Sequence, residues 1–248
     1  MKILLTGDFG MIGTRLKEFW TNKHDLEFLD IQNGKDLRHC DLNYEVDLVL
    51  HLAGKSGVRK SLEDMNSYWR HNVETFQRLI EAFPNTRIIY ASSSTAKEPF
   101  RNPYAYTKYV MESIAPKNSL GLRFTTVYGS DKREQMFIPK LLRKEIEYIN
   151  NHRRDFIHVD DVVSAIDLLT QTNLCGVIDV GTGTSNSIKD LVDIVYGKNS
   201  FQIQECDWHE RIDNIASPKE LEDLGWSPKH NIKSWLTKAK KESNINNS

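Results

Sequence analysis

The sequence predicts an α/β fold built on a doubly wound parallel sheet, with a smaller part at its C-terminal end. Three observations lead to this prediction. Short apolar runs alternate with segments of helical periodicity, one of these runs is apolar on both faces, and a glycine-rich loop follows the first run. Such alternation is typical of parallel sheets whose two faces are covered by helices.

The elements of the first half justify this prediction in order. Helical spacing of apolar residues is expected after the glycine loop, again over residues 73–83, and over 104–115. The run at 46–54 is apolar on both faces, as expected of a central parallel strand. Strands are expected in the segments KILLT, DLEFLD, VDLVLHLAG, RIIYASSS and LGLRFTTVYG.

The regular alternation of expected strands and helices changes after Gly129. The segment MFIPKLLRKEIEYI is expected to be helical, RRDFIHVDDVVSAIDLLT to be a strand, turn and helix, GVIDVGTG a strand, and SIKDLVDIVYG a helix. The last eight residues or so are polar, and we expect them to be disordered.

Composition excludes several classes of function. The formal net charge of the 248-residue chain is −1 and its charges are mixed along the sequence, so nucleic acid is not an expected partner. No run approaches the ~20 apolar residues that cross a membrane, and the first residues lack the pattern of a signal peptide. Three isolated cysteines fit a reducing cytoplasm and predict no metal site.

The glycine loop predicts a dinucleotide site. It places three glycines at the end of the first strand and the start of the first helix, where backbone N–H groups can approach a pyrophosphate. Asp30 lies 17 residues after Gly13, at the end of the second strand, where an acid can bind the adenosine ribose and repel a 2′-phosphate. NAD is therefore expected rather than NADP, although an acid that merely ends a strand is the alternative. The candidate loop contacts are Gly7, Gly10, Met11, Ile12 and Gly13.

Tyr104 and Lys108 form a possible acid/base pair. Their i, i+4 spacing puts a phenol and an ammonium on one helix face. A lysine near a phenol favours the phenolate, which would make the tyrosine a usable base at neutral pH. Taken alone, an exposed helix edge with a snorkelling lysine is the alternative.

The motifs occur together in one order: the glycine loop, HLAG at 51–54, SSS at 92–94, Tyr-x-x-x-Lys at 104–108, LRFTTVYG at 122–129 and RDFIHVDD at 154–161. This set resembles the extended short-chain dehydrogenase/reductase family, specifically its NAD-dependent nucleotide-sugar epimerases and dehydratases. The resemblance implies a Rossmann-type NAD-binding domain over residues 1–129, to which 154–175 return. It implies that 130–153 and 176–248 form a smaller substrate-binding part.

The resemblance also implies roles for individual residues. Tyr104 would be the acid/base, and Lys108 would hold the nicotinamide ribose. Ser93 would bind the reacting oxygen. The alternative is that the three serines are merely polar residues at the end of a strand. Arg154 would clamp a substrate diphosphate, with an ordinary ion pair to one of the acids that follow it as the alternative. Thr126 would lie near the nucleotide. His158 would be structural. Further cofactor contacts would be Asp41, Leu42, Leu52, Ala53 and Gly54.

Departures from the family's pattern narrow the expected reaction. Ser94 and Thr95 stand where the dehydratases carry acids, and Thr95 also stands where an epimerase-reductase type carries a cysteine. We therefore expect a cytoplasmic, NAD-dependent epimerase of a nucleotide-linked sugar that oxidises and re-reduces one carbon, C4 by expectation. A keto-sugar reductase and a non-catalytic NAD-binding regulator are the alternatives. The resemblance implies a homodimer formed through the helices at 73–83 and 104–115.

Overall fold

The computed structural model describes residues 1–129, 134–198 and 200–245. The chain forms two compact units, each made from separate segments. The first unit comprises residues 1–124 and 163–179, and the second comprises 125–162 and 180–248. These units are defined by contacts within the chain. The NAD-binding and substrate-binding domains expected from the sequence remain a prediction.

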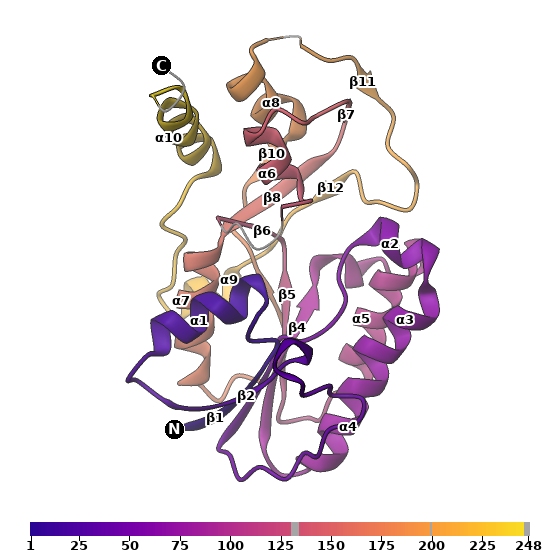
Figure 1. Cartoon of the computed structure of the whole chain (residues 1–248), viewed down its shortest axis with the longest axis vertical. Coiled ribbons are helices and arrows are strands. Elements are labelled where there is room, and N and C mark those ends of the chain that lie inside the picture. Colours follow the sequence, from indigo (N-terminus) through magenta and orange to yellow (C-terminus); the bar gives the residue numbers. More distant parts are fainter. Residues whose placement is uncertain (130–133, 199, 246–248) are drawn as a thin grey trace. The chain divides into compact units, whose positions relative to one another are not determined.

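The first unit contains a six-stranded sheet in the order β2-β1-β3-β4-β5-β9. Strands β1 to β5 pair in parallel. In Figure 1 the helices α3, α4 and α5 lie on one side of this sheet and α1 lies on the other. The predicted doubly wound α/β fold is thereby confirmed. The strands are β1 (Lys2–Thr6), β2 (Asp25–Leu29), β3 (Leu48–His51), β4 (Arg87–Ser93), β5 (Leu120–Phe124) and β9 (Gly176–Val180).

Most helices of the first unit connect these strands. The helix expected at 73–83 begins as a turn of π-helix and continues as α4. The helices are α1 (Met11–Trp20), η1 (Ile31–Asn33), α2 (Val58–Glu63), α3 (Met65–Trp69), η2 (Arg70–Glu74), α4 (Thr75–Ala82), η3 (Ser94–Lys97), η4 (Pro99–Arg101), α5 (Pro103–Ile114) and α7 (Val159–Thr170), of which 163–170 belong to this unit.

A buried apolar cluster fixes these helices to the sheet. It joins Leu4, Val49 and Ile88 of three neighbouring strands to Phe76 and Leu79 of α4. These side chains have almost no exposed surface, and each contributes roughly 1.5–3 kcal/mol of hydrophobic stabilisation. The packed sheet therefore gives a rigid base for the loops at its carboxyl edge.

The second unit contains a smaller sheet in the order β10-β8-β12, with β6 also paired to β8. Its core gathers apolar side chains of α6, α8 and α10 around Phe156 of β8. The elements are β6 (Thr126–Tyr128), α6 (Phe137–Leu142), β7 (Ile149–Asn150), β8 (Arg153–His158), β10 (Ser185–Ser187), α8 (Ile188–Tyr196), β11 (Ile203–Gln204), β12 (Asp213–Asn214), α9 (Lys219–Asp223) and α10 (Ile232–Ile245).

Three expectations differ from the structure. The expected strand LGLRFTTVYG is two strands, β5 and β6, because the N–H of Thr125 between them donates to the carbonyl of Val180. The expected helix MFIPKLLRKEIEYI ends at Leu142, since Lys144 adopts a left-handed φ of 58° and Ile149 begins β7. The helix α10 continues to Ile245, into the tail expected to be disordered, and 246–248 lie outside the described residues.

Candidate functional site

Several of the predicted cofactor and catalytic residues lie at the carboxyl ends of three neighbouring strands in the first unit. Gly7 follows β1, Leu52 follows β3, and Ser93 ends β4. The chain leaves β1 toward β2 on one side and later returns to β3 on the other. A crevice at such a reversal is where ligands bind in open α/β sheets.

The glycine loop is shaped so that side chains cannot be added. Gly7 has a φ of 77°, and a Cβ there would lie 2.6 Å from the backbone nitrogen of Ala53. A Cβ on Gly13 would lie 2.3 Å from the carbonyl oxygen of Gly7. The loop therefore needs glycine both for its turn and for the close contact between α1 and β1.

The start of α1 fits an anionic ligand. The helix begins at Met11, and no described side chain caps it at Gly10. The first N–H groups of a helix, here those of Met11, Ile12 and Gly13, have no intrahelical acceptor. Together with the positive end of the helix dipole, they are suited to a pyrophosphate.

The negative charge of Asp8 is balanced by a lysine of the same chain. The sequence places this acid in the loop, where a carboxylate would repel a pyrophosphate. Its side chain is almost fully buried and accepts a hydrogen bond from Lys17 Nζ at 2.7 Å. The ammonium on α1 thus offsets the charge of Asp8.

Asp30 connects the glycine loop to the residues after β2. Its Oδ2 accepts the N–H of Phe9 at 3.3 Å, and its Oδ1 accepts the N–H of Gln32 at 2.9 Å. These bonds fix the carboxylate beside the loop, as a ribose-binding acid requires. Arg78 donates to the carbonyls of Leu37 and Cys40 and so holds the segment that leads to Asp41 and Leu42.

A buried pair positions the loop after β3. The Oγ1 of Thr6 lies 2.8 Å from the Nδ1 of His51 and accepts the N–H of Ala53 at 3.2 Å. Burial, assisted by the charge of Lys108, lowers the pKa of His51 to about 3, so this imidazole is neutral. Sequence reasoning missed the pair, although both polar residues occur inside apolar strands.

The three serines at the end of β4 differ in their surroundings. The Oγ of Ser92 donates to Glu112, whose carboxylate also accepts two hydrogen bonds from Arg123. The Oγ of Ser93 instead accepts from the hydroxyl of Thr95 at 2.9 Å. Ser92 is thus committed to a structural network, which favours Ser93 as the hydroxyl of the site.

Lys108 is a buried residue of α5 and not an exposed helix edge. Its Nζ donates to the carbonyl of Ala91 at 2.8 Å, and a Cβ on Gly54 would lie 3.7 Å from this atom. Burial lowers the pKa of Lys108 to about 8, against the opposing effect of Glu112. Tyr104 is half-buried, one turn earlier, with its ring edge-to-face against Tyr68. The alternative of a snorkelling lysine is therefore wrong.

Asn72 joins α5 to the loop after β3. It is fully buried in the π-helical turn η2, where its Nδ2 donates to the Oγ1 of Thr107 at 3.0 Å. Its amide also exchanges hydrogen bonds with the backbone N–H and carbonyl of Lys55. Because π-helical turns are frequent at functional sites, this residue belongs to the candidate site. Its sequence signal is a polar residue in a helix that is otherwise packed by apolar side chains.

The predicted substrate residues Thr126 and Arg154 belong to the second unit, on β6 and β8. The Nη2 of Arg154 donates to Glu210 Oε2 at 3.0 Å, and its Nη1 donates to the carbonyl of Arg211 at 2.8 Å. Arg154 thus forms an ion pair, but its acid is Glu210 of a distant segment and not one of the acids that follow Arg154, which the alternative expected.

Asp155, the neighbour of Arg154, organises the loop after β9. It is fully buried and accepts the N–H groups of Thr182, Gly183 and Ala216. The hydroxyl of Thr182 donates to it as well, at 2.6 Å. The segments RD at 154–155 and VGTG at 180–183 are therefore linked in the structure, because the carboxylate of the first accepts hydrogen bonds from the second.

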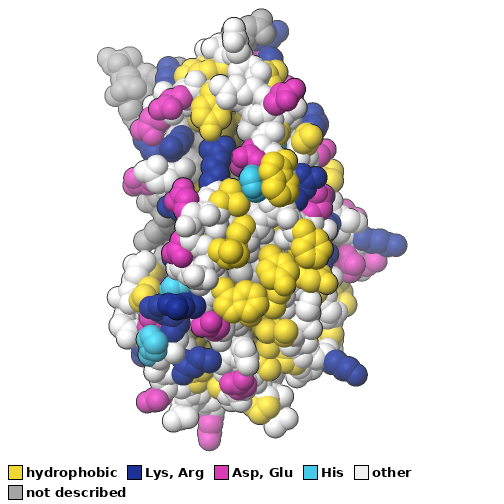
Figure 2. Space-filling view, turned by 90° about the vertical axis from the view of Figure 1, so that its right-hand side faces the viewer, with side chains coloured by type: hydrophobic (Ala, Val, Ile, Leu, Met, Phe, Trp, Pro, Cys, Tyr) yellow, Lys and Arg dark blue, Asp and Glu magenta, His cyan; other side chains and the backbone are white. Residues whose placement is uncertain are grey.

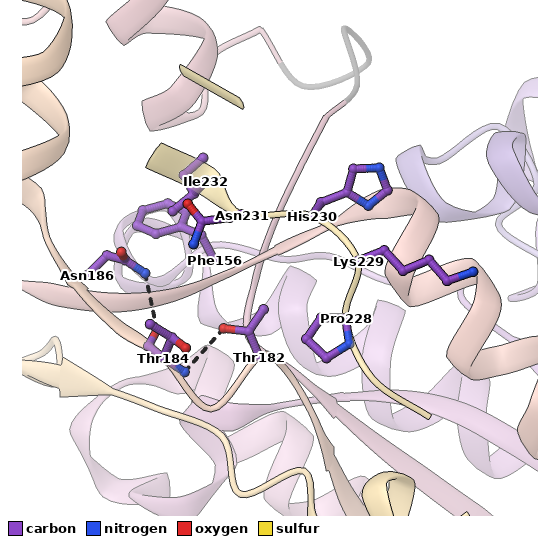
Figure 3. A pocket seen from close by; sticks show the side chains of 9 residues that line it. All are labelled: Phe156, Thr182, Thr184, Asn186, Pro228, Lys229, His230, Asn231 and Ile232. Carbon is purple, nitrogen blue, oxygen red and sulfur yellow. Dashed lines mark hydrogen bonds between the residues drawn. The ribbon is translucent and has the colours of Figure 1, made fainter. Parts of the chain in front are cut away.

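The same loop lines a small pocket in the second unit. Figure 3 shows Thr182, Thr184 and Asn186 on one side of this pocket, with the side chains of Lys229 and His230 extending on the other. The threonine and asparagine side chains give this wall a hydrogen-bonding character.

The chain is similar to several known proteins. The model of the "NAD dependent epimerase/dehydratase family" matches residues 3–181. A "Putative UDP-glucose 4-epimerase" of Methanocaldococcus jannaschii is 27% identical over 93% of this chain and 94% of its own length. "Protein CapI" of Staphylococcus aureus is 29% identical over 69% of this chain and 70% of its own.

Among solved structures, "MoeE5 in complex with UDP-glucose and NAD" superimposes with a TM-score of 0.85 at 26% identity, over 100% of both chains. NAD is therefore bound by a protein of the same fold as this chain. Among the described residues, no helix has the length and apolar character needed to span a membrane.

Proposed function

The chain belongs to the NAD-dependent epimerase/dehydratase family, and from this membership we propose that it is an NAD-dependent epimerase of a nucleotide-linked sugar, acting at C4. The observation that carries the proposal is the buried Lys108 on the helix of Tyr104, with its Nζ beside Gly54 and the carbonyl of Ala91. A binding protein without chemistry would gain nothing from the desolvation of this ammonium.

The residues of the first unit are proposed to bind NAD. The glycine loop and the uncapped start of α1 would hold the pyrophosphate, and Asp30 would accept the ribose hydroxyls. Leu52, Ala53 and Gly54 would line the cofactor, while Asp41 and Leu42 would meet the adenine. When bound here, NAD would supply an acceptor for the hydride of the sugar carbon and a donor of that hydride to the opposite face of the resulting ketone.

Tyr104, Ser93 and Lys108 are proposed to manage the proton. The phenolate oxygen of Tyr104 would take the hydroxyl proton of the sugar during oxidation and give it back during reduction. The hydroxyl of Ser93 would bind the same sugar oxygen. The ammonium of Lys108 would favour the phenolate, since a nearby positive charge stabilises the anionic form of a phenol.

Dehydration is not supported by the residues that follow the catalytic serine. Ser94 and Thr95 carry no carboxyl group, and the hydroxyl of Thr95 donates to Ser93. An elimination of water needs a base for the departing proton and an acid for the leaving hydroxide. Transient oxidation needs only the transfer of a hydride and of the single proton that Tyr104 would carry.

The substrate is proposed to be a nucleoside diphosphate sugar. Arg154 offers a planar fork of donors that suits a diphosphate, and Thr126 would contact the nucleotide. Two relatives support this class of substrate. One is named a putative UDP-glucose 4-epimerase, and the other is solved with UDP-glucose.

One experiment tests the proposed reaction. The purified protein is incubated without added coenzyme with UDP-glucose, UDP-N-acetylglucosamine and UDP-glucuronate in turn, and the products are separated and analysed by NMR. The proposal expects a C4 epimer of at least one substrate, with NAD retained on the enzyme. Failure to convert any of these sugars, together with NADH- or NADPH-dependent reduction of a nucleotide-linked keto-sugar, would show a reductase instead.

We further propose that the protein is a homodimer. Four exposed aromatic residues, Trp69, Phe100, Tyr106 and Tyr109, form an aromatic patch on α3, η4 and α5, with exposed fractions of 37–82%. The rings of Trp69 and Phe100 both contact that of Tyr106. Figure 2 shows hydrophobic side chains gathered on the face that carries these helices. Contiguous apolar patches of this kind mark interaction surfaces.

A further inference from the structure

We propose that Glu112 is a positioning residue for the reaction described above, whose carboxylate supports the charge of Lys108 and fixes α5 to the end of β4. This role rests on the proposed function, which it deepens. Glu112 follows Lys108 by one turn of α5, as Lys108 follows Tyr104. Residues at i and i+4 are neighbours on a helix, so the three side chains form one row along α5.

The carboxylate of Glu112 joins α5 to two neighbouring strands. It accepts a hydrogen bond from the hydroxyl of Ser92 on β4, and two from the Nε and Nη2 of Arg123 on β5, at 2.9 and 2.6 Å. Ser92 and Arg123 are partners in the parallel register of these strands, so their side chains lie on the same face of the sheet. The side chain of Glu112 is 7% exposed. Three hydrogen bonds therefore hold a nearly buried negative charge beside the catalytic helix.

The helix α5 binds β4 at two adjacent residues of the strand. The Nζ of Lys108 donates to the carbonyl of Ala91 at 2.8 Å, and Glu112 accepts the hydroxyl of Ser92. These bonds lie one turn apart on the helix and one residue apart on the strand, so together they fix the register of α5 on β4. The next residue of the strand is Ser93, the proposed catalytic hydroxyl. Glu112 thereby helps to fix how the catalytic helix meets the strand end that carries this serine.

The negative charge of Glu112 opposes the effect of burial on Lys108. Burial lowers the pKa of this lysine to about 8, while the carboxylate of Glu112 raises it. Without the carboxylate, the ammonium would lose its proton at a still lower pH. A neutral amine cannot favour the phenolate of Tyr104, so the charge of Glu112 keeps the lysine usable near neutral pH.

Other titratable or charged groups face this network from the same helix and from four strands. They are Tyr104 of α5, His51 of β3, Tyr90 of β4, Arg123 of β5 and Asp179 of β9, which pairs with Lys97. Burial lowers the pKa of His51 to about 3 and raises that of Tyr90, while the hydrogen bond to Glu112 raises the pKa of Arg123. These three keep their charge states between about pH 7 and 9. The phenol of Tyr104 is therefore the group that an experiment on Lys108 has to remove.

The test is urea unfolding of the full chain, stripped of nucleotide, at a series of pH values from about 6 to 10. All proteins in this test carry Tyr104→Phe, so that the phenol does not titrate. The stability of this reference should rise with pH above about 8, because the lysine of the unfolded chain binds its proton up to a pKa of 10.5. With Glu112→Gln, which keeps the shape of the side chain, the rise should begin about 0.5–1 pH unit lower. With Arg123→Gln it should begin at a higher pH, since the carboxylate is no longer shared with a guanidinium.

Two controls assign these shifts to Lys108. Glu145→Gln breaks a similar two-bond pair with Arg143 in the second unit, where both side chains are exposed, and it should leave the onset of the rise unchanged. Adding Lys108→Met to Glu112→Gln should abolish the rise between about pH 7 and 9. Glu112→Asp keeps the charge, and it should move the onset less than Glu112→Gln does.

Turnover gives a second measurement, in proteins that retain Tyr104. Glu112→Gln should lower kcat about twofold to fivefold at pH 8 with little change in KM, because the protonated fraction of Lys108 falls from about a half to between a quarter and a tenth. A loss of stability with an unchanged onset would show that Glu112 is purely structural and would overturn the proposal. An unchanged onset in Arg123→Gln would do the same, and this variant decides the question if Glu112→Gln does not fold. Since unfolding needs no substrate, a parent that converts no sugar would refute the proposed function alone.

Discussion

Arg154 and Glu210 form a partly buried ion pair in which the guanidinium donates to the carboxylate at 3.0 Å and to the carbonyl of Arg211 at 2.8 Å. The side chains are 14% and 19% exposed, so water screens the pair only in part. The fork proposed to bind a diphosphate is thus occupied by an acid of the chain itself. A phosphate would have to share or displace this carboxylate.

This pair makes a first prediction about substrate affinity. Glu210→Gln keeps a hydrogen-bond acceptor but removes a negative charge, so it should tighten the binding of UDP about threefold to tenfold. Arg154→Ala should weaken it tenfold or more. NAD affinity, measured in parallel by calorimetry, should stay nearly constant in both variants. If Arg154→Ala reduced the affinities for UDP and NAD equally, its role would be structural.

Asp30 should determine the choice of cofactor. Because its carboxylate is fixed beside the glycine loop, NADH should bind at least tenfold more tightly than NADPH, a difference of about 1.4 kcal/mol. Asp30→Ala should reduce this preference, as measured by fluorescence titration. Asp25→Ala, at an exposed acid of β2, is the control and should leave it unchanged. Identical titration curves of the parent for both cofactors would contradict the assignment.

Tyr104→Phe tests the proton transfer directly. It removes one oxygen and preserves the ring that packs against Tyr68, so the melting temperature should barely change. Turnover should fall by about 10²–10⁴-fold, as is typical when a general acid/base is lost. The measurement is kcat on the substrate identified above, with Tyr106→Phe on the exposed side of α5 as the control. Near-normal turnover of Tyr104→Phe would refute the role of the phenol.

Lys108 should lower stability at neutral pH. Its pKa in the folded protein is about 8 against 10.5 for the unfolded chain, so the unfolded state binds more protons between these values. The free energy of unfolding contributed by this group therefore rises with pH from about 8 to 10.5, by roughly 3 kcal/mol at most.

The variant Lys108→Met has no ionisable group at this position, so the pH-dependent contribution of Lys108 to stability is absent. We expect it to be more stable than the parent at pH 7, with the difference shrinking toward pH 10, in urea unfolding of protein stripped of nucleotide. Its turnover should fall, since the charge that favours the phenolate is gone. A difference in stability that did not depend on pH would show that Lys108 is not perturbed by burial.

The aromatic patch should hold two copies of the chain together. Phe100→Glu combined with Tyr106→Glu would place charges in a desolvated interface, which is strongly unfavourable. We expect a folded monomer by sedimentation velocity where the parent sediments as a dimer. The variant Tyr148→Glu changes an aromatic residue of the second unit that is about as exposed as Tyr106, and it should remain dimeric. A monomeric parent would exclude the proposed assembly.

The sequence allowed the fold to be predicted well because its signals are local. Apolar runs, helical spacing and the glycine loop each depend on neighbouring residues, and their order defines a doubly wound sheet. The glycine requirement at Gly13 is equally local, because its Cβ would meet Gly7, whereas a Cβ on Gly7 would meet the backbone of the distant Ala53. The roles assigned to Ser93, Tyr104 and Lys108 stay predictions, although the burial of Lys108 fits them.

The parts that escaped prediction depend on contacts between distant segments. Nothing near Arg154 in sequence indicates that Glu210 will meet its guanidinium, and nothing near Lys55 indicates that Asn72 will bind its backbone. The same holds for Asp161 and His230, which are brought together only by the folded second unit. A single sequence carries no signal for such pairs.

The position of β9 in the sheet has a consequence for how the chain folds during its synthesis on the ribosome. Strand β5 ends at Phe124, but its neighbour β9 begins at Gly176, about 50 residues later. At synthesis rates of roughly 5–20 residues per second, the open edge of β5 waits some 3–10 s for its partner. Unpaired strand edges invite association with other chains. A message truncated after Phe124 should therefore yield a product that aggregates, whereas the nascent full-length chain closes its own edge.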